Sequence, residues 1–268
     1  MKKAIKITIS SVVGVVILVL VWIAFCGFQW SWGPFCKLHD IKTGSYPGNA
    51  EEYAIKNVTP LENSPLKGKE VFFLGSSVTY GAASKSVSFA DYIGARNECH
   101  SIKEAVSGTT LVDKSSSSYV SRLKKTKTEK VGLFVCQLST NDATQKKPLG
   151  EISSSKNIDD FDTKTVAGAI EYIIEYANER WDCPVTFYTN PKYDSKLYGD
   201  RVTLLLQIAK KWDIQVIDFW NDAEFNNISE EERQLYRADS IHPTQAGYLK
   251  WWTPRREKDL YQIVQQKD

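Results

Sequence analysis

The stretch EVFFLGSSVTYG, residues 70–81, decides the fold of this 268-residue chain. Its apolar run, Val71 to Leu74, predicts a buried strand, and the glycines at 75 and 81 predict a tight turn directly after it. Such a turn lifts a side chain above the end of the strand, so we expect the hydroxyl of Ser77 at the edge of a sheet. That position suits a nucleophile.

The stretch DSIH, residues 239–242, places a carboxylate and an imidazole three residues apart near the far end of the chain. An unassisted serine hydroxyl is a poor nucleophile, because it needs an imidazole to take its proton and an acid to fix the tautomer of that imidazole. One short loop can hold both groups. The sequence therefore predicts a catalytic triad of Ser77, His242 and Asp239.

Two segments between these stretches supply hydrogen-bond donors of the kind that acyl transfer requires. AVSGTT, residues 105–110, ends a second apolar strand in a loop of small residues, and STND, residues 139–142, directly follows the apolar run from Val131 to Leu138. A backbone N–H of the first loop and the amide side chain of Asn141 are suitable donors to a developing oxyanion. Both segments are expected at the same sheet edge as Ser77.

Together these four segments resemble the SGNH, or GDSL-type, hydrolase superfamily, over about residues 69 to 265. The resemblance implies a nucleophile, a base and the partner of that base at Ser77, His242 and Asp239. It also implies an oxyanion hole formed by the backbone N–H groups of Ser77 and Gly108 and by the Asn141 side chain.

Two positions depart from the pattern of that superfamily. Ser76 stands where the family usually has Asp, and Ser139 stands where it usually has Gly. Neither position is one of the family's core catalytic residues, so the predicted triad is kept. The departures leave the subfamily and the substrate open.

Strand and helix signals alternate along the chain from residue 70 onward. The predicted strands span residues 70–74, 101–106, 131–138, 184–188 and 215–219. The predicted helices span residues 88–95, 117–125, 163–181 and 196–212, and a last one starts near Thr244. This alternation predicts a three-layer α/β/α sandwich around a central, mainly parallel five-stranded sheet, with ligands at the carboxyl ends of the strands.

The N-terminus predicts a membrane anchor. Ile7 to Phe28 is almost wholly apolar and free of charge, and as a helix it is about 33 Å long, enough to cross a bilayer core. Three lysines precede it, at positions 2, 3 and 6, which favours a cytoplasmic tip and an outward-facing domain. A cleaved signal peptide is the alternative. We expect a tip and anchor at 1–28, a stalk at 29–68 and a hydrolase domain at 69–268.

Composition and charge exclude several classes. The net charge is +2 and no basic stripe interleaves with aromatics, so a nucleic-acid partner is not expected. The most basic run, residues 122–130, is interpreted as a solvated helix end. His39, His100 and His242 are scattered without paired ligand spacing, so no metal site is predicted. The long polar segment at residues 143–162 is a candidate rim or lid over the site.

These observations predict a serine esterase at the outer face of the cell membrane that needs no cofactor. Its substrate is expected to be a carboxylic ester, either an acetylated cell-surface glycan or a lipid, with a small acyl group favoured. Two alternatives stay open. One is an O-acyltransferase that uses the same acyl-enzyme, and the other is a catalytically silent surface protein that uses the fold for binding.

Overall fold

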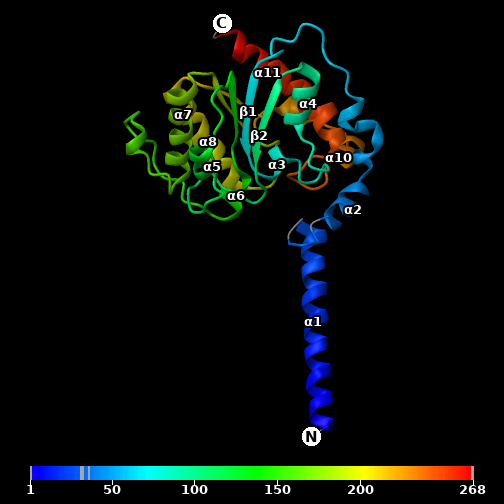
Figure 1. Ribbon diagram of the computed structural model, residues 1–268. Helices are drawn as coiled ribbons and strands as arrows, with labels where there is room; N and C mark the ends of the chain where they lie inside the picture. The colour runs from blue at the N-terminus through cyan, green and yellow to red at the C-terminus, as the bar shows by residue number, and fades with distance from the viewer. Residues whose placement is uncertain (1, 31–32, 36, 267–268) are drawn as a thin grey trace.

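The computed structural model describes residues 2–30, 33–35 and 37–266. Figure 1 shows a central sheet with a layer of helices on each face and one long helix, α1 (Lys2–Trp30), that extends away from the domain. This arrangement confirms the predicted α/β/α sandwich.

All five strands of the sheet are parallel, and their spatial order is β2-β1-β3-β4-β5. Each lies within two residues of a predicted strand at both ends, and their bounds are β1 Glu70–Gly75, β2 His100–Ala105, β3 Leu133–Gln137, β4 Val185–Tyr188 and β5 Gln215–Ile217. Because β1 pairs with both β2 and β3, the loops that follow β2 and β3 flank the turn that follows β1. This topology gathers three of the four sequence segments.

Four helices confirm the predicted ones: α4 Phe89–Asn97, α5 Tyr119–Lys125, α7 Val166–Trp181 and α8 Lys196–Trp212. Side-chain oxygens of Ser88, Thr165 and Ser195 accept backbone N–H groups at the starts of α4, α7 and α8, which explains why these helices begin there. The predicted last helix begins at position 245, with a π-helical segment, η5 Gly247–Trp252, before α11 Thr253–Gln265.

The chain also forms short helices that the sequence pattern did not predict: α2 Leu38–Gly44, α3 Ser77–Tyr80, α6 Thr140–Thr144, α9 Ala223–Asn226, α10 Glu230–Tyr236, and the 3₁₀ turns η1 Pro47–Asn49, η2 Glu51–Tyr53, η3 Ile55–Asn57 and η4 Ile158–Asp160. Most are a single turn, too short to show a helical period in sequence.

The three inner strands, β1, β3 and β4, are buried on both faces. Successive side chains of a strand point to opposite sides, so each face of the sheet has its own core. Phe72 and Leu74 of β1 pack into a core with α5, α7 and α8. Val71 and Phe73, which alternate with these two residues along β1, pack into a second core with α4, η5 and α11. The near-continuous apolar runs in the sequence therefore correspond to strands covered by helices on both faces.

The segment expected to be a stalk is folded over much of its length. Tyr53 is 7 % exposed and Leu66 is fully buried against the second core. The buried Asn49 donates to the carbonyl oxygens of Thr43 and Ala83, at 2.7 and 2.8 Å. Residues of this segment thus pack against the α/β sandwich at several points.

Among the residues that the structure describes, one helix is long and apolar enough to cross a membrane, through its window Val12–Gln29 with a mean hydropathy of 2.6. Such a helix fits either an anchor or a signal sequence. Its carboxyl end is close to the domain, because the ring nitrogens of His39 lie 2.9 Å from the Phe28 carbonyl oxygen and 2.9 Å from that of Ala82. The sheet edge marked by α3 and α6 therefore faces the same side as α1 (Figure 1).

Candidate active site

The turn between β1 and α3 holds Ser77 at the carboxyl edge of the sheet. Gly75 approaches α3 so closely that a Cβ at this position would collide with Thr79 Oγ1. Gln137, buried at the end of β3, accepts the backbone N–H of Ser76 and the hydroxyl of Thr79, each at 2.9 Å. Ser77 is the first residue of α3 and is 9 % exposed. The turn is therefore fixed by buried contacts, and the nucleophile candidate has a defined position.

The late loop brings His242 to this serine. Nε2 of His242 lies 2.8 Å from Ser77 Oγ, although the two residues are 165 positions apart in sequence. Nδ1 of His242 lies 2.8 Å from Asp239 Oδ2. The loop is closed by a backbone hydrogen bond of 2.9 Å from the Ala238 N–H to the His242 carbonyl. The structure thus places Ser77, His242 and Asp239 in one hydrogen-bonded line.

The carboxylate of Asp239 is held ionised by its surroundings. Burial alone would raise its pKa, but the hydrogen bond and charge of His242 and the backbone N–H groups of Ile241 and His242 outweigh burial and lower the pKa from 3.8 to about 2. Both N–H groups donate to Oδ1, at 2.7 and 2.8 Å. Oδ2 is the nearer carboxylate oxygen to Nδ1, at 2.8 Å against 3.1 Å for Oδ1, so the carboxylate fixes the proton on Nδ1 and leaves Nε2 as an acceptor.

The predicted oxyanion donors lie in two loops beside this turn. The Val106 N–H donates to the Gly75 carbonyl at 3.3 Å, so the loop after β2 begins next to the turn that carries Ser77. Gly108 has a φ of 78°, in the left-handed region that favours glycine. Asn141 Nδ2 donates to the Thr109 carbonyl at 3.0 Å, which occupies one of its two amide protons. The second proton is available to a ligand.

Asp142 holds these two loops together, a role that the sequence did not assign. Its fully buried carboxylate accepts the backbone N–H groups of Leu111 and Val112, at 2.7 and 3.2 Å. Burial raises the pKa of Asp142 despite these bonds. The only sequence signal for this role was its place directly after Asn141.

The two serines that depart from the superfamily pattern are both hydrogen-bonded in buried surroundings. Ser76 Oγ donates to Gln137 Oε1 at 3.3 Å. Ser139 Oγ accepts the backbone N–H of Asn141 and donates to the Thr109 carbonyl, each at 3.1 Å. Ser139 therefore strengthens the connection between the loop that carries Asn141 and the loop that carries Gly108.

The interpretation of residues 122–130 as a solvated helix end is wrong for its first member. Arg122 is 8 % exposed, and its guanidinium donates to the carbonyls of Gly75 at 2.7 Å, Glu104 at 2.8 Å and Ser117 at 2.9 Å. Arg122 also pairs with the Glu104 carboxylate at 3.0 Å. The cause is the start of α5, which turns this one side chain inward to the ends of β1 and β2.

A cavity of about 220 Å³ lies beside Gly108. It is lined by the loop at residues 106–110, by hydroxyls of Ser115 and Ser117, and by Lys114, Gln145 and Lys147. Polar and cationic groups thus surround the space next to the predicted oxyanion loop.

Only the start of the predicted rim or lid borders this cavity, through Gln145 and Lys147. The Pro148 and Leu149 carbonyls accept N–H groups at the start of α7, and Ser153 N–H donates to Glu171 at 2.9 Å. Phe161 is buried against the core of α7 and α8. These contacts hold the remainder of the segment along the two helices and away from the site, which differs from a lid.

The arrangement has the parts that acyl transfer needs. It contains a hydroxyl with an acceptor nitrogen at 2.8 Å, a carboxylate that orients that nitrogen, and neighbouring N–H donors. No cluster of three or more His, Cys, Asp or Glu side chains suited to a metal ion occurs among residues 2–30, 33–35 and 37–266.

The chain matches the family model of the GDSL-like lipase/acylhydrolase family over residues 73–250. A protein from Lactobacillus plantarum superposes with a TM-score of 0.60 at 19 % identity, over 73 % of this chain and 96 % of that one. A protein from Bacteroides ovatus ATCC 8483, described as a GDSL-like lipase, gives 0.56 at 16 % identity, over 73 % and 99 %.

An active-site mutant of a family two carbohydrate esterase from Clostridium thermocellum gives a TM-score of 0.50 at 14 % identity, over 77 % of this chain and 65 % of that one. At these identities the likeness shows a shared fold. Among proteins of curated function, no sequence match is found.

Proposed function

We propose that Ser77, His242 and Asp239 are the catalytic triad of this chain, which belongs to the GDSL-like lipase/acylhydrolase family of carboxylic ester hydrolases. One observation carries the proposal. The Ser77 hydroxyl, the His242 ring and the Asp239 carboxylate are joined by two successive contacts of 2.8 Å. A hydroxyl, an imidazole and a carboxylate in this order activate the hydroxyl for attack on a carbonyl.

Each half of the reaction uses the same three groups. Ser77 Oγ would bond to the ester carbonyl carbon while its proton passes to His242 Nε2, and collapse of the tetrahedral intermediate would expel the alcohol, which takes that proton. Water would then lose a proton to Nε2 and attack the acyl carbon. Cleavage of the bond to Oγ would release the acid and return the proton to Ser77. Asp239 would keep its charge and stabilise the imidazolium in both halves.

The oxyanion of each tetrahedral intermediate would be bound by the backbone N–H groups of Ser77 and Gly108 and by Asn141 Nδ2. Two contacts support this part. Asn141 is fixed by its bond to Thr109 with one amide proton to spare, and Val106 joins the Gly108 loop to the nucleophile turn. A rigid set of donors is what such stabilisation requires, because donors that must reorganise lose their advantage.

We further propose that the acyl group is small, most simply the acetyl of a cell-surface carbohydrate. The cavity beside Gly108 is about 220 Å³ and is lined by Ser, Thr, Lys and Gln side chains. A long acyl chain needs an apolar tunnel, whereas a two-carbon acyl group fits a small polar space. Because the sheet edge with Ser77 faces the side of α1, the glycan would lie near the membrane surface.

For the chain as a whole, we propose a cytoplasmic tip and membrane anchor at 1–28, a stalk at 29–68 that packs partly on the domain, and an outward-facing hydrolase domain at 69–268. The apolar window of α1 and the lysines before it support the anchor and its orientation. In intact cells, after wall removal where needed, external protease should digest the domain, and the chain should sediment with membranes. Full protection of the domain would contradict the orientation, and recovery of a shortened soluble chain would mean cleavage.

The triad is tested by labelling with a fluorophosphonate probe, which reacts with an activated serine. Ser77→Ala should lose labelling and esterase activity while its thermal unfolding stays cooperative. Ser76→Ala is the matched control, one residue away and outside the line of contacts, and should still label. Loss of labelling in Ser76→Ala together with its retention in Ser77→Ala would show that the wrong serine was chosen.

The acyl size is tested with p-nitrophenyl esters of increasing chain length. We expect kcat/KM to be highest for acetate and to fall steeply by octanoate, because the lining of the cavity is mainly polar and only Val106 offers an apolar side chain to a longer chain. A maximum at octanoate or beyond would reject the acetyl proposal and favour a lipid substrate.

A further inference from the structure

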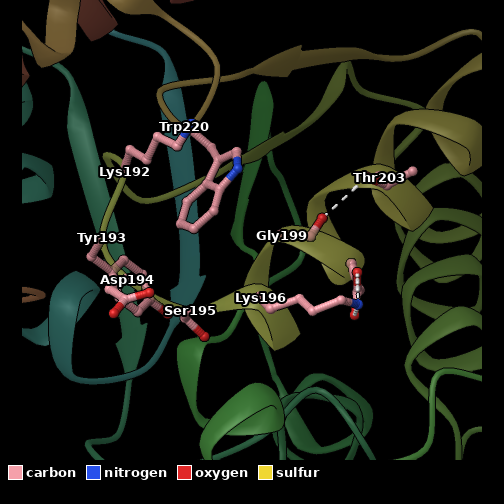
Figure 2. A pocket seen from close by; sticks show the side chains of 9 residues that line it. Lys192, Tyr193, Asp194, Ser195, Lys196, Gly199, Thr203 and Trp220 are labelled. Atoms are coloured by element: carbon pink, nitrogen blue, oxygen red, sulfur yellow. Dashed lines mark hydrogen bonds and ion pairs between the residues drawn. The ribbon is translucent and has the colours of Figure 1, made fainter.

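A second, larger cavity lies at the carboxyl ends of β4 and β5. It has a volume of about 630 Å³ and is lined by Lys192, Tyr193, Asp194, Ser195, Lys196, Gly199, Asp200, Thr203 and Trp220. Figure 2 shows the Trp220 indole between the loop that carries Tyr193 to Ser195 and the first turns of α8 at Gly199. This volume is typical of a small-molecule site. The proposed triad does not include any of these residues.

The indole of Trp220 is held in place before any ligand arrives. Its backbone N–H donates to Thr189 Oγ1 at 2.9 Å. Its ring centroid lies 5.5 Å from that of Tyr193, edge to face, and 5.2 Å from that of Tyr198. Gly199 leaves room for the ring, because a Cβ there would lie 3.3 Å from Trp220 Cζ2. A rigid aromatic surface loses little conformational entropy when a ligand packs on it.

The polar groups around this ring favour a neutral ligand that is rich in hydroxyls. The lining contains two lysines and two aspartates, so their charges balance. Lys196 and Asp200 pair with each other at 3.0 Å. Within the described part of the chain, Lys192 Nζ, the Asp194 carboxylate and the indole N–H of Trp220 have no hydrogen-bond or ion-pair partner. These groups provide both donors and an acceptor next to an apolar ring.

Other ligand classes fit this lining less well. A lipid chain needs apolar walls, and here four charged side chains face the space. A phosphate or carboxylate ligand would gain from the lysines but would be opposed by Asp194 and Asp200. A pyranose ring satisfies both requirements, because it presents C–H groups on its faces and hydroxyls at its rim.

The cavity is connected to the proposed triad through one buried residue. Asn190, fully buried, donates from Nδ2 to the carbonyl of Ile241 at 3.2 Å. Ile241 precedes His242, and Asn190 lies two residues before Lys192 at the cavity wall. The end of β5 is three strand spacings of about 4.8 Å from the end of β1, or about 14 Å. That distance is spanned by a short oligosaccharide.

We propose that this cavity is a saccharide subsite in which a neutral pyranose ring packs against Trp220 while its hydroxyls bind Asp194 and Lys192. It rests on the proposed function in one respect, because the bound ring would belong to the same glycan whose ester Ser77 cleaves. The subsite names the substrate class as an oligosaccharide that extends from the scissile ester toward β5. It would add binding energy remote from the reacting carbonyl.

The test is calorimetric titration of the full-length Ser77→Ala chain in detergent with cellotetraose, xylotetraose and tetra-N-acetylchitotetraose, none of which carries an O-acetyl ester. At least one should bind with a Kd of about 1 mM or tighter. Adding Trp220→Leu should weaken that binding about tenfold or more, because Leu keeps apolar bulk but removes the flat ring. The matched control is Trp181→Leu, a half-buried tryptophan at the end of α7, just before the amino end of β4 and outside the cavity lining, and its affinity should be unchanged.

Asp194→Ala provides a second variant at an exposed residue, where folding is not at risk, and it should weaken the same binding severalfold. Absence of binding by all three oligosaccharides, or affinity that is unchanged in both Trp220→Leu and Asp194→Ala, would overturn the proposal. Hydrolysis of p-nitrophenyl acetate by the wild-type chain separately reports on the triad. Saccharide binding that depends on Trp220 in a chain without Ser77-dependent esterase activity would reject the proposed function alone.

Discussion

Replacement of Asp239 by Asn should abolish most activity by inverting the hydrogen bonds of His242. In the structure, Asp239 Oδ1 accepts the backbone N–H groups of Ile241 and His242, and Oδ2 faces His242 Nδ1. An Asn at this position would place its only carbonyl oxygen against the two N–H groups. Its NH₂ group would then face Nδ1 and donate to it, which forces the ring proton onto Nε2. Nε2 could no longer accept the proton of Ser77.

The expected cost follows from this loss of the correct tautomer. In a serine-protease triad the equivalent change lowers kcat about 10⁴-fold, which corresponds to about 5.4 kcal/mol of transition-state stabilisation. Because the backbone bonds to Oδ1 are retained here, the loop should keep its shape and KM should change little. Initial rates of p-nitrophenyl acetate hydrolysis, measured from pH 5 to pH 9, give kcat and KM directly.

The control is Asp222→Asn, which replaces another carboxylate at this side of the domain. Asp222 caps α9 by accepting the Phe225 N–H at 2.9 Å and pairs with Arg255 at 3.0 Å. Asn is an equally good cap, and neither contact includes a residue of the proposed triad, so activity should persist. Retention of more than about a tenth of wild-type kcat in Asp239→Asn would refute the reasoning, since the wrong tautomer cannot support general-base catalysis at that rate.

Three further outcomes are expected. Asn141→Ala should lower kcat about a hundred- to a thousandfold with little change in KM, and an unchanged kcat for p-nitrophenyl acetate would remove Asn141 from the mechanism. Arg122→Met should lower the free energy of unfolding in urea by about 3 kcal/mol, because three buried carbonyls lose a charged donor, whereas Lys130→Met should have little effect. The pKa of Asp239 is lowered from 3.8 to about 2, so its contribution to stability is present above pH 3.8 and is lost as the pH falls through about 2. The melting temperatures of wild type and Asp239→Asn should therefore converge at the acid end. A constant difference down to pH 2 would contradict this.

The strands and long helices were predictable because their signals are local. The apolar run at residues 71–74 and the helical spacing at residues 196–212 reflect the periodicity of the backbone itself, and β1 and α8 formed where they were expected. The single-turn helices, including those at residues 47–57, were not predictable. Their stability comes from contacts with distant residues, such as the hydrogen bond from the Asn49 side chain to the Ala83 carbonyl oxygen. Such contacts have no period along the chain.

For the candidate site, too, the residue types were predictable from sequence, whereas their proximity was not. The residue types of Ser77, His242 and Asp239, and their places after a strand or within one loop, were visible in the sequence because they depend on short stretches. That His242 Nε2 lies 2.8 Å from Ser77 Oγ is a property of the packing after β5, where Tyr248 donates to the Val78 carbonyl at 2.6 Å and so returns the late loop to the end of β1. Sequence spacing alone does not encode that return.

Arg122 and Trp220 mark what only the tertiary structure decided. In sequence, Arg122 opens a basic run and Trp220 follows a short strand, and neither has a local pattern that distinguishes it from a surface residue. In the fold, the first lies among carbonyls from three segments and the second lies in a cavity between two strand ends. A side chain's environment is set by the elements that surround it in space, and these come from parts of the chain that local preference does not connect.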